Sequence, residues 1–246
     1  MTNPDPDAVR ATFEGIAPRY DLANHLLSGG LDFLWRRRLI REAKASRPSE
    51  VLDLATGSGD VALALREALP AEVKVTGLDF CPPMLAEAER KRISVGCSRD
   101  SLRFVHGDCL SLDFPDSSFD LVTIAFGLRN LSDRVLGLSE MHRLLRPGGR
   151  LLILEFSQPF FFLRPFYYLY LRGFLPLFAR LVTGDRKAYE YLGSSISGFP
   201  DRFGLAEELR QANFGKVNFF SLTGACLLYT SPSPRDQRGS RMPSSG

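Results

Sequence analysis

The segment Val51-Leu52-Asp53-Leu54-Ala55-Thr56-Gly57-Ser58-Gly59 combines an apolar run with a glycine-rich turn. A short apolar run that ends at small, turn-forming residues is typical of a buried strand in a parallel sheet. Residues 61–69 follow with helical spacing and end at Pro70. A strand, a glycine-rich turn and a helix in this order predict the first unit of an α/β sheet.

Strands and helices continue to alternate along the chain. We predict strands at residues 74–79, 102–106, 119–125 and 151–157, the last after a turn at 146–149, and helices at residues 31–45, 82–92 and 134–145. This order predicts a doubly wound, Rossmann-like parallel sheet with helices on both faces. Ligands bind such sheets at the carboxyl ends of the strands, so residues at strand ends are the first candidates for a site.

Three carboxylates stand at or near the ends of the first three strands. Asp79 closes the second strand and suits the ribose hydroxyls of an adenosine ligand. Asp108 follows the third strand and suits an adenine amino group. Asp53 lies inside the first strand, where a buried acid needs partners, and we expect it to accept from loop amides or to reach an ammonium group through water. The backbone of Gly57, Ser58 and Gly59 would meet the ligand at the helix N-terminus.

Two cofactors fit this pattern. Gly57-x-Gly59-x-x-Ala62, with Asp79 twenty residues beyond Gly59, also matches the dinucleotide fingerprint of an NAD dehydrogenase. Three carboxylates favour a cationic ligand over a pyrophosphate, and S-adenosylmethionine carries an adenosine, an ammonium and a sulfonium group. We therefore predict S-adenosylmethionine as the cofactor and keep NAD as the alternative.

Composition excludes several other classes of protein. The 246 residues carry a net charge of only +3, which does not indicate a nucleic-acid partner. Four cysteines without CxxC spacing and three histidines predict no metal site and no disulfide framework. The polar N-terminus is not a signal peptide, so we expect a cytoplasmic protein.

Longer motifs resemble one family. Residues 52–60 resemble the first motif of class I methyltransferases. The other matching segments are Tyr20-Asp21-x-x-Asn24-x-x-Leu27-Ser28, Leu31-Asp32-x-x-Trp35-Arg36-Arg37, Phe126-Gly127-Leu128-Arg129-Asn130, residues 143–151 and Leu154-Glu155-Phe156-Ser157. Together, over about residues 9–224, they resemble the ubiquinone/menaquinone biosynthesis C-methyltransferases of the demethylmenaquinone methyltransferase type.

The resemblance implies the fold and the site residues. It implies a class I methyltransferase sheet with an N-terminal helical lid and an inserted aromatic-rich helical segment after the fifth strand. The implied cofactor residues are Asp53, Gly57, Ser58, Gly59, Asp79, Asp108, Cys109 and Ala125. Ala125 replaces a frequent serine, and Cys109 is expected to pack and offer its backbone amide rather than act as a nucleophile.

The implied reaction is C-methylation of a polyprenylated hydroquinone ring, from demethylmenaquinol to menaquinol. Arg129 would stabilise the ring phenolate, because arginine stays protonated, and Asn130 would orient the ring. Tyr20, Asp21 and Asn24 would close over the pocket, or equally would cap and pack a helix. The alternatives are a dual ubiquinone/menaquinone enzyme, which Ala23 and Asp32 make less favoured, another small-molecule methyltransferase, and a non-catalytic subunit of a quinone-synthesis complex.

An aromatic stretch suggests how a long isoprenoid tail is held. Residues 156–178 contain ten aromatic side chains, interrupted by arginines and prolines, and therefore do not predict a membrane span. We expect part of residues 160–178 to line an apolar tunnel or to touch an anionic membrane at its inner face, with Arg164, Arg172 and Arg180 near headgroups. A homo-oligomer is a further expectation.

The chain divides into one domain and a tail. We predict a methyltransferase domain over residues 1–226, made of a helical cap (1–48), the cofactor-binding core (49–157), a helical substrate cover (158–200) and a C-terminal helix and strand (201–226). Residues 227–246 include ten Ser, Pro or Gly residues and predict a disordered, non-native tail. Three of the 31 basic residues and one of the 28 acidic residues lie in this tail, so the domain itself is nearly neutral.

Overall fold

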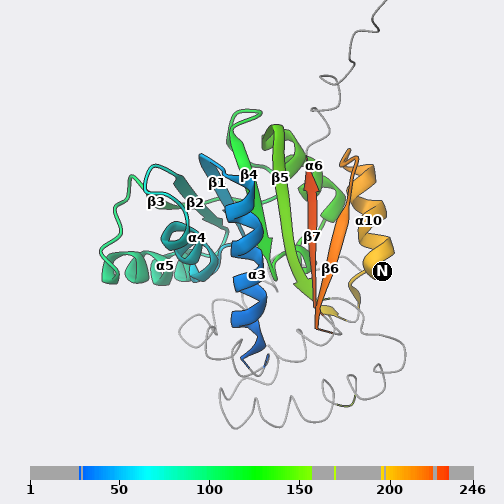
Figure 1. Ribbon diagram of the computed structural model, residues 1–246, viewed down its shortest axis with the longest axis horizontal. Helices are drawn as coiled ribbons and strands as arrows, with labels where there is room; N and C mark the ends of the chain where they lie inside the picture. The colour runs from blue at the N-terminus through cyan, green and yellow to red at the C-terminus, as the bar shows by residue number, and fades with distance from the viewer. Residues whose placement is uncertain are drawn as a thin grey trace, which may run out of the picture.

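The computed structural model describes residues 28, 30–156, 169, 195–196, 198–223 and 226–232. They contain a seven-stranded sheet in the order β3-β2-β1-β4-β5-β7-β6, with helices packed against it (Figure 1). The strands are β1 (Glu50–Leu54), β2 (Lys74–Asp79), β3 (Leu102–His106), β4 (Phe119–Ala125), β5 (Leu145–Phe156), β6 (Asn218–Thr223) and β7 (Cys226–Pro232). The helices are α3 (Leu31–Ser46), α4 (Asp60–Ala68), α5 (Pro82–Ser94), the 3₁₀ turn η2 (Leu128–Asn130), α6 (Arg134–Leu144) and α10 (Arg202–Gln211).

Strands β1 to β5 are parallel, and the strand order reverses between β1 and β4. Successive side chains on each strand point to opposite faces, so the sheet has a core on both sides. Trp35 and Leu39 of α3 pack with α4 on one face. Leu138 of α6 and Leu205 of α10 pack on the other. The predicted α/β sheet with helices on both faces is confirmed for the described residues.

One predicted boundary inside the core shifts. The sequence predicts a turn at residues 146–149 before the fifth strand, but β5 begins earlier, at Leu145. Leu145 pairs with Phe119 and Arg150 with Leu121, so the intervening residues form an irregularity within the strand, with Gly148 at φ 79°. Turn-forming residues here interrupt the register without ending the strand.

The predicted disordered tail from residue 227 is wrong for its first residues. Strand β7 continues to Pro232, lies between β5 and β6 and pairs antiparallel with both. Tyr229 is 1% exposed, and the Ser231 hydroxyl donates to the Lys216 carbonyl at 2.5 Å. Backbone pairing on two sides stabilises polar residues that lack a hydrophobic pattern, which is why composition misplaced the boundary. Residues 233–246 lie outside the described part of the chain.

Most of the predicted lid and substrate cover also lies outside the described residues. This applies to residues 1–27 and to nearly all of 157–197, which include the aromatic stretch beyond Phe156. Within the ranges that the structure describes, no helix has the length and apolar character needed to cross a membrane.

Candidate cofactor and substrate site

The loop after β1, residues 55–59, has an unusual backbone. Ala55, Gly57 and Gly59 all have positive φ, at 48°, 58° and 84°. A Cβ on Gly59 would lie 2.8 Å from the Ala88 Cβ and 2.8 Å from the Phe104 ring. Gly59 therefore serves both the turn and the close packing of the first turn of α4 against its neighbours. We call residues 55–59 the donor loop, because the predicted methyl donor would bind here.

Asp79 ties the end of β2 to the donor loop. Its Oδ2 accepts from the Gly57 amide at 2.8 Å, and its Oδ1 accepts from the Cys81 amide at 2.9 Å. Burial raises the pKa of this carboxyl, and the amide hydrogen bonds oppose that rise. The Phe80 amide also donates to Asp79, so about one of the four acceptor positions of the carboxylate remains for a ribose hydroxyl. Asp79 therefore lies against the glycine turn, and its contact with a ribose stays a prediction.

Asp53 is buried where the strand order reverses. Its two oxygens accept from the hydroxyls of Thr56 and Thr123, each at 2.6 Å. Burial raises the pKa of Asp53 to about 6, although both hydroxyls lower it. These partners differ from the loop amides that we expected, because the Thr123 side chain on the neighbouring strand reaches the carboxylate first.

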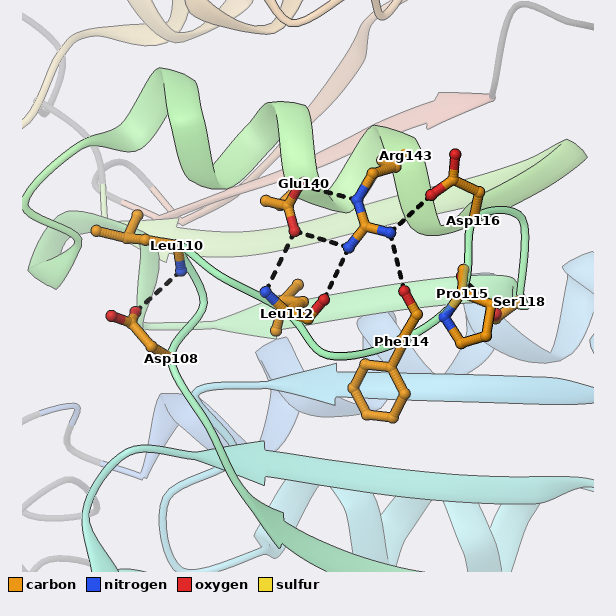
Figure 2. Close-up of polar contacts among 9 residues, drawn as sticks. All are labelled: Asp108, Leu110, Leu112, Phe114, Pro115, Asp116, Ser118, Glu140 and Arg143. Carbon is orange, nitrogen blue, oxygen red and sulfur yellow. Dashed lines mark hydrogen bonds and ion pairs between the residues drawn. The ribbon is translucent and has the colours of Figure 1, made fainter.

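The loop after β3 carries Asp108 and is fixed by an arginine (Figure 2). Asp108 is exposed and accepts from the Leu110 amide at 2.9 Å, which forms a tight turn. Further along, the Arg143 guanidinium donates to the carbonyls of Leu112 and Phe114, each at 2.8 Å. It also donates to the carboxylates of Asp116 and Glu140. All five N–H donors of this α6 side chain are therefore used, and they fix the loop against α6.

Cys109 is a packing residue in this structure. Its side chain is buried, and burial together with the nearby Asp79 carboxylate raises the thiol pKa to about 12. A thiol with that pKa stays protonated near neutral pH and is a poor nucleophile. This geometry agrees with the non-nucleophilic interpretation of the sequence.

The loop after β4 packs directly on the donor loop. We call residues 126–130 the acceptor loop. A Cβ on Gly127 would lie 2.5 Å from the Ala55 Cβ, so only glycine allows this contact. Phe126 has φ 57°, and the Asn130 amide donates to the Gly127 carbonyl at 3.0 Å. The two loops therefore meet at the point where the strand order reverses.

Arg129 lies in a buried ion pair. Its guanidinium donates to the Glu155 carboxylate at 2.7 Å and to the Phe126 carbonyl at 2.5 Å, and it lies 5.5 Å from the centre of the Phe156 ring. Its charge is thus balanced inside the protein. Contact of Arg129 and Asn130 with a substrate stays a prediction.

The remaining predicted residues divide by their place in the structure. Ser58 is buried in the donor loop, and Ala125 is half-buried at the end of β4. Tyr20, Asp21 and Asn24 lie outside the described residues. Among the residues that are described, no group of His, Cys, Asp or Glu side chains could hold a metal ion.

Sequence reasoning missed four contributors to this site: Thr56, Thr123, Arg143 and Glu155. Thr56, Arg143 and Glu155 stand within the family motifs, but none of these residue types indicates a partner. The Asp53–Thr123 contact joins residues 70 positions apart and becomes visible only when β1 and β4 pair.

These residues fit the predicted donor. Asp53 of β1 and Asp79 of β2 both accept hydrogen bonds from the donor loop, and their carboxylates would offer acceptors to a cationic ligand with hydroxyl groups. Asp79 keeps free acceptor capacity beside the donor loop. Contact of Asp53 with the ammonium and of Asp79 with the ribose stays a prediction.

Comparisons with known proteins agree with this geometry. The sequence profile of the ubiE/COQ5 methyltransferase family matches residues 1–231. The demethylmenaquinone methyltransferase of Deinococcus radiodurans is 47% identical, over 88% of both chains. That of Thermus thermophilus is 45% identical over 90% of this chain and all of its own. The ubiquinone/menaquinone biosynthesis C-methyltransferase of a Geobacter species is 42% identical over 89% of this chain and 92% of its own.

Solved structures support the fold alone. A putative S-adenosylmethionine-dependent methyltransferase of Methanococcus maripaludis superposes with a TM-score of 0.62 at 15% identity, over 89% of this chain and 93% of its own. An S-adenosylmethionine-dependent methyltransferase of Aquifex aeolicus superposes with a TM-score of 0.56 at 17% identity, over 75% of this chain and 82% of its own.

Proposed function

The chain belongs to the ubiE/COQ5 methyltransferase family, and from that premise we propose that it methylates a ring carbon of demethylmenaquinol to give menaquinol. It is an S-adenosylmethionine-dependent C-methyltransferase of quinone biosynthesis. The observation that carries the proposal is the family match over residues 1–231, which contains both the donor loop and the acceptor loop. Relatives named demethylmenaquinone methyltransferase reach 47% identity, against 42% for one named for both quinones.

When bound, S-adenosylmethionine supplies an electrophilic methyl group. The side chains of Asp53 and Asp79 and the backbone of the donor loop would orient it toward the acceptor loop. The ring carbon becomes nucleophilic when a neighbouring hydroxyl loses its proton, and a phenol pKa near 10 needs only modest lowering. The ring carbon would take the methyl group, S-adenosylhomocysteine would be the leaving group, and the proton of that ring carbon would be lost to solvent.

We assign the acceptor side to Arg129 and Asn130. Both lie in η2, and Gly127 just before it packs against Ala55 of the donor loop. Glu155 holds the Arg129 guanidinium in place and balances its charge, so the guanidinium is already oriented before a phenolate forms. A preoriented donor group can stabilise a developing anion without reorganisation during the reaction.

The test uses the purified chain with methyl-labelled S-adenosylmethionine and two acceptors. We expect label in menaquinol when demethylmenaquinol is offered and little label with the demethylated ubiquinol precursor. Equal labelling of both acceptors would support the dual-specificity alternative. No labelling of either would contradict the proposal.

The membrane contact belongs to the same proposal, at the inner face of the cell membrane, and helix α3 supports it. Phe33 and Leu34 are 54% and 57% exposed, and Arg37, Arg41 and Lys44 are exposed on the same helix. An exposed apolar tip flanked by cations suits an anionic bilayer surface, from which a polyprenyl substrate would come.

Sedimentation with vesicles rich in phosphatidylglycerol tests this contact. Phe33→Ser is expected to reduce binding at low salt, whereas the control Phe203→Ser, on exposed Phe203 of α10, leaves it unchanged. Equal binding by Phe33→Ser and the unaltered chain would overturn the assignment to α3. Light scattering on the same samples tests the expected homo-oligomer.

A further inference from the structure

Two consecutive residues of α3 contact the two sides of the site: one the start of α4, directly after the donor loop, and the other the acceptor loop. The guanidinium of Arg36 donates to the carboxylate of Asp60, which directly follows Gly59 and begins α4. The Trp35 ring lies 6.0 Å from the Phe126 ring in the acceptor loop and 5.8 Å, edge to face, from the Phe156 ring at the end of β5. One turn of one helix thus reaches both sides of the site.

The contact on the donor side is a three-element ion-pair cluster. Lys91 of α5 donates to the other Asp60 oxygen at 2.6 Å, opposite Arg36. The Arg36, Asp60 and Lys91 side chains are 14%, 24% and 18% exposed. Burial alone would raise the pKa of Asp60, but the two cations outweigh it and lower that pKa. In this partly buried setting the cluster is more strongly held than an exposed surface pair.

The contact on the acceptor side supports a strained residue. Phe126 has φ 57°, which is unfavourable for a residue with a large side chain. Its ring packs in a cluster of three with Trp35 and Phe156, whose ring is 4.8 Å away, and its backbone precedes Gly127, which abuts Ala55. Such a conformation persists only where the surroundings fix it, and Trp35 is the contribution of α3 to that support.

We propose that Trp35 and Arg36 are positioning residues for methyl transfer, which together hold the donor loop and the acceptor loop at a fixed separation. Arg36 acts through Asp60 and Trp35 acts through Phe126, so neither residue needs to touch a ligand. In-line transfer depends on the distance between the reacting atoms, and a displacement of about 1 Å can cost about 100-fold in rate. The kinetic test of this inference rests on the proposed function, because it measures kcat. The fluorescence test needs only that the cofactor binds.

The kinetic test compares three variants with a matched control. Arg36→Met and Trp35→Leu are each expected to lower kcat about tenfold. The double variant should lower kcat by much less than the product of the two, because both act on one separation. The control is Arg38→Met on the same helix, whose side chain pairs with Glu42 at 2.7 Å and lies 4.8 Å from the centre of the Phe220 ring, away from both loops. It should leave kcat within about twofold, with circular dichroism confirming that every variant is folded.

A spectroscopic test separates positioning from stability. Trp35 is the single tryptophan of the chain, so its fluorescence reports on α3 alone. Titration with S-adenosylhomocysteine is expected to change this fluorescence in the unaltered protein. In Arg36→Met, calorimetry should still detect binding while the fluorescence change is lost.

Two results would overturn the proposal: multiplicative kcat losses in the double variant, or an unchanged fluorescence response in Arg36→Met. Failure of the unaltered enzyme to methylate demethylmenaquinol would instead contradict the proposed function, and the fluorescence test would remain informative.

Discussion

The guanidinium of Arg129 and the carboxylate of Glu155 meet at 2.7 Å, with 6% and 0% of their side chains exposed. Removing one partner of a buried pair leaves the other charge without compensation, which typically costs about 3–5 kcal/mol. We therefore expect Glu155→Gln to lower the free energy of unfolding by about that amount, measured by urea denaturation. The exposed pair of Arg210 and Glu207 provides the control, because Glu207→Gln should change the free energy of unfolding by less than about 0.5 kcal/mol.

Arg143 offers a test of the loop that carries Asp108. Lysine keeps the charge but lacks the fork of five donors that contacts Leu112, Phe114, Asp116 and Glu140. Arg143→Lys is expected to weaken binding of S-adenosylhomocysteine several-fold in calorimetry, because the loop loses its fixed shape. The matched variant Arg146→Lys, whose pair with Asp120 lies outside this loop, should bind normally. Equal affinities for the two variants would argue against a role for Arg143 in the site.

The sequence predicted the elements that carry strong local signals. Residues 102–106 and 119–125 were predicted as strands and are β3 and β4 with the same bounds. The central strand β4 is a buried, largely apolar run, which is a strong local signal. Thr123 as a partner of Asp53 and Glu155 as a partner of Arg129 were not predictable, because each of these hydrogen bonds joins residues on different elements. The spacing that places a carboxylate at a strand end says nothing about which hydroxyl or guanidinium will reach it.

Asp53 makes the free energy of unfolding depend on pH. Its pKa is about 6 in the folded protein and 3.8 when unperturbed, so the folded state binds more protons between these values. Stability therefore falls as the pH rises through this window, and the full cost is present above pH 6. Relative to Asp53→Asn, the unaltered protein should lose about 2–3 kcal/mol of unfolding free energy between pH 4 and pH 7. Parallel pH curves for the two proteins, measured by urea denaturation without cofactor, would show that Asp53 is not the titrating group.

Two glycines with nearly the same backbone conformation distinguish the effect of backbone strain on stability from that of overpacking. Gly30 and Gly59 have φ of 78° and 84°, but a Cβ on Gly30 meets nothing within 4 Å, whereas one on Gly59 meets Ala88 and Phe104. Gly30→Ala should cost about 1–2 kcal/mol from backbone strain. Gly59→Ala should cost about 1–3 kcal/mol more from overpacking, and Phe104→Leu should recover part of that excess. Thermal unfolding of the three variants checks this order, and equal losses for the two glycines would contradict it.

The last prediction concerns strand β7, which lies where composition predicted a disordered tail. A chain ending at residue 232 keeps every described strand and is expected to unfold at the same temperature as the full chain. A chain ending at Thr223 loses β7 and leaves β5 and β6 unpaired on the edges that face each other. It also removes the buried Tyr229 ring from the core that α6 and α10 cover. We expect this shorter chain to lose cooperative unfolding and to aggregate through the exposed edge of β5. Size-exclusion chromatography and circular dichroism distinguish the two chains, and a cooperative, monomeric chain ending at Thr223 would mean that β7 is dispensable for the fold.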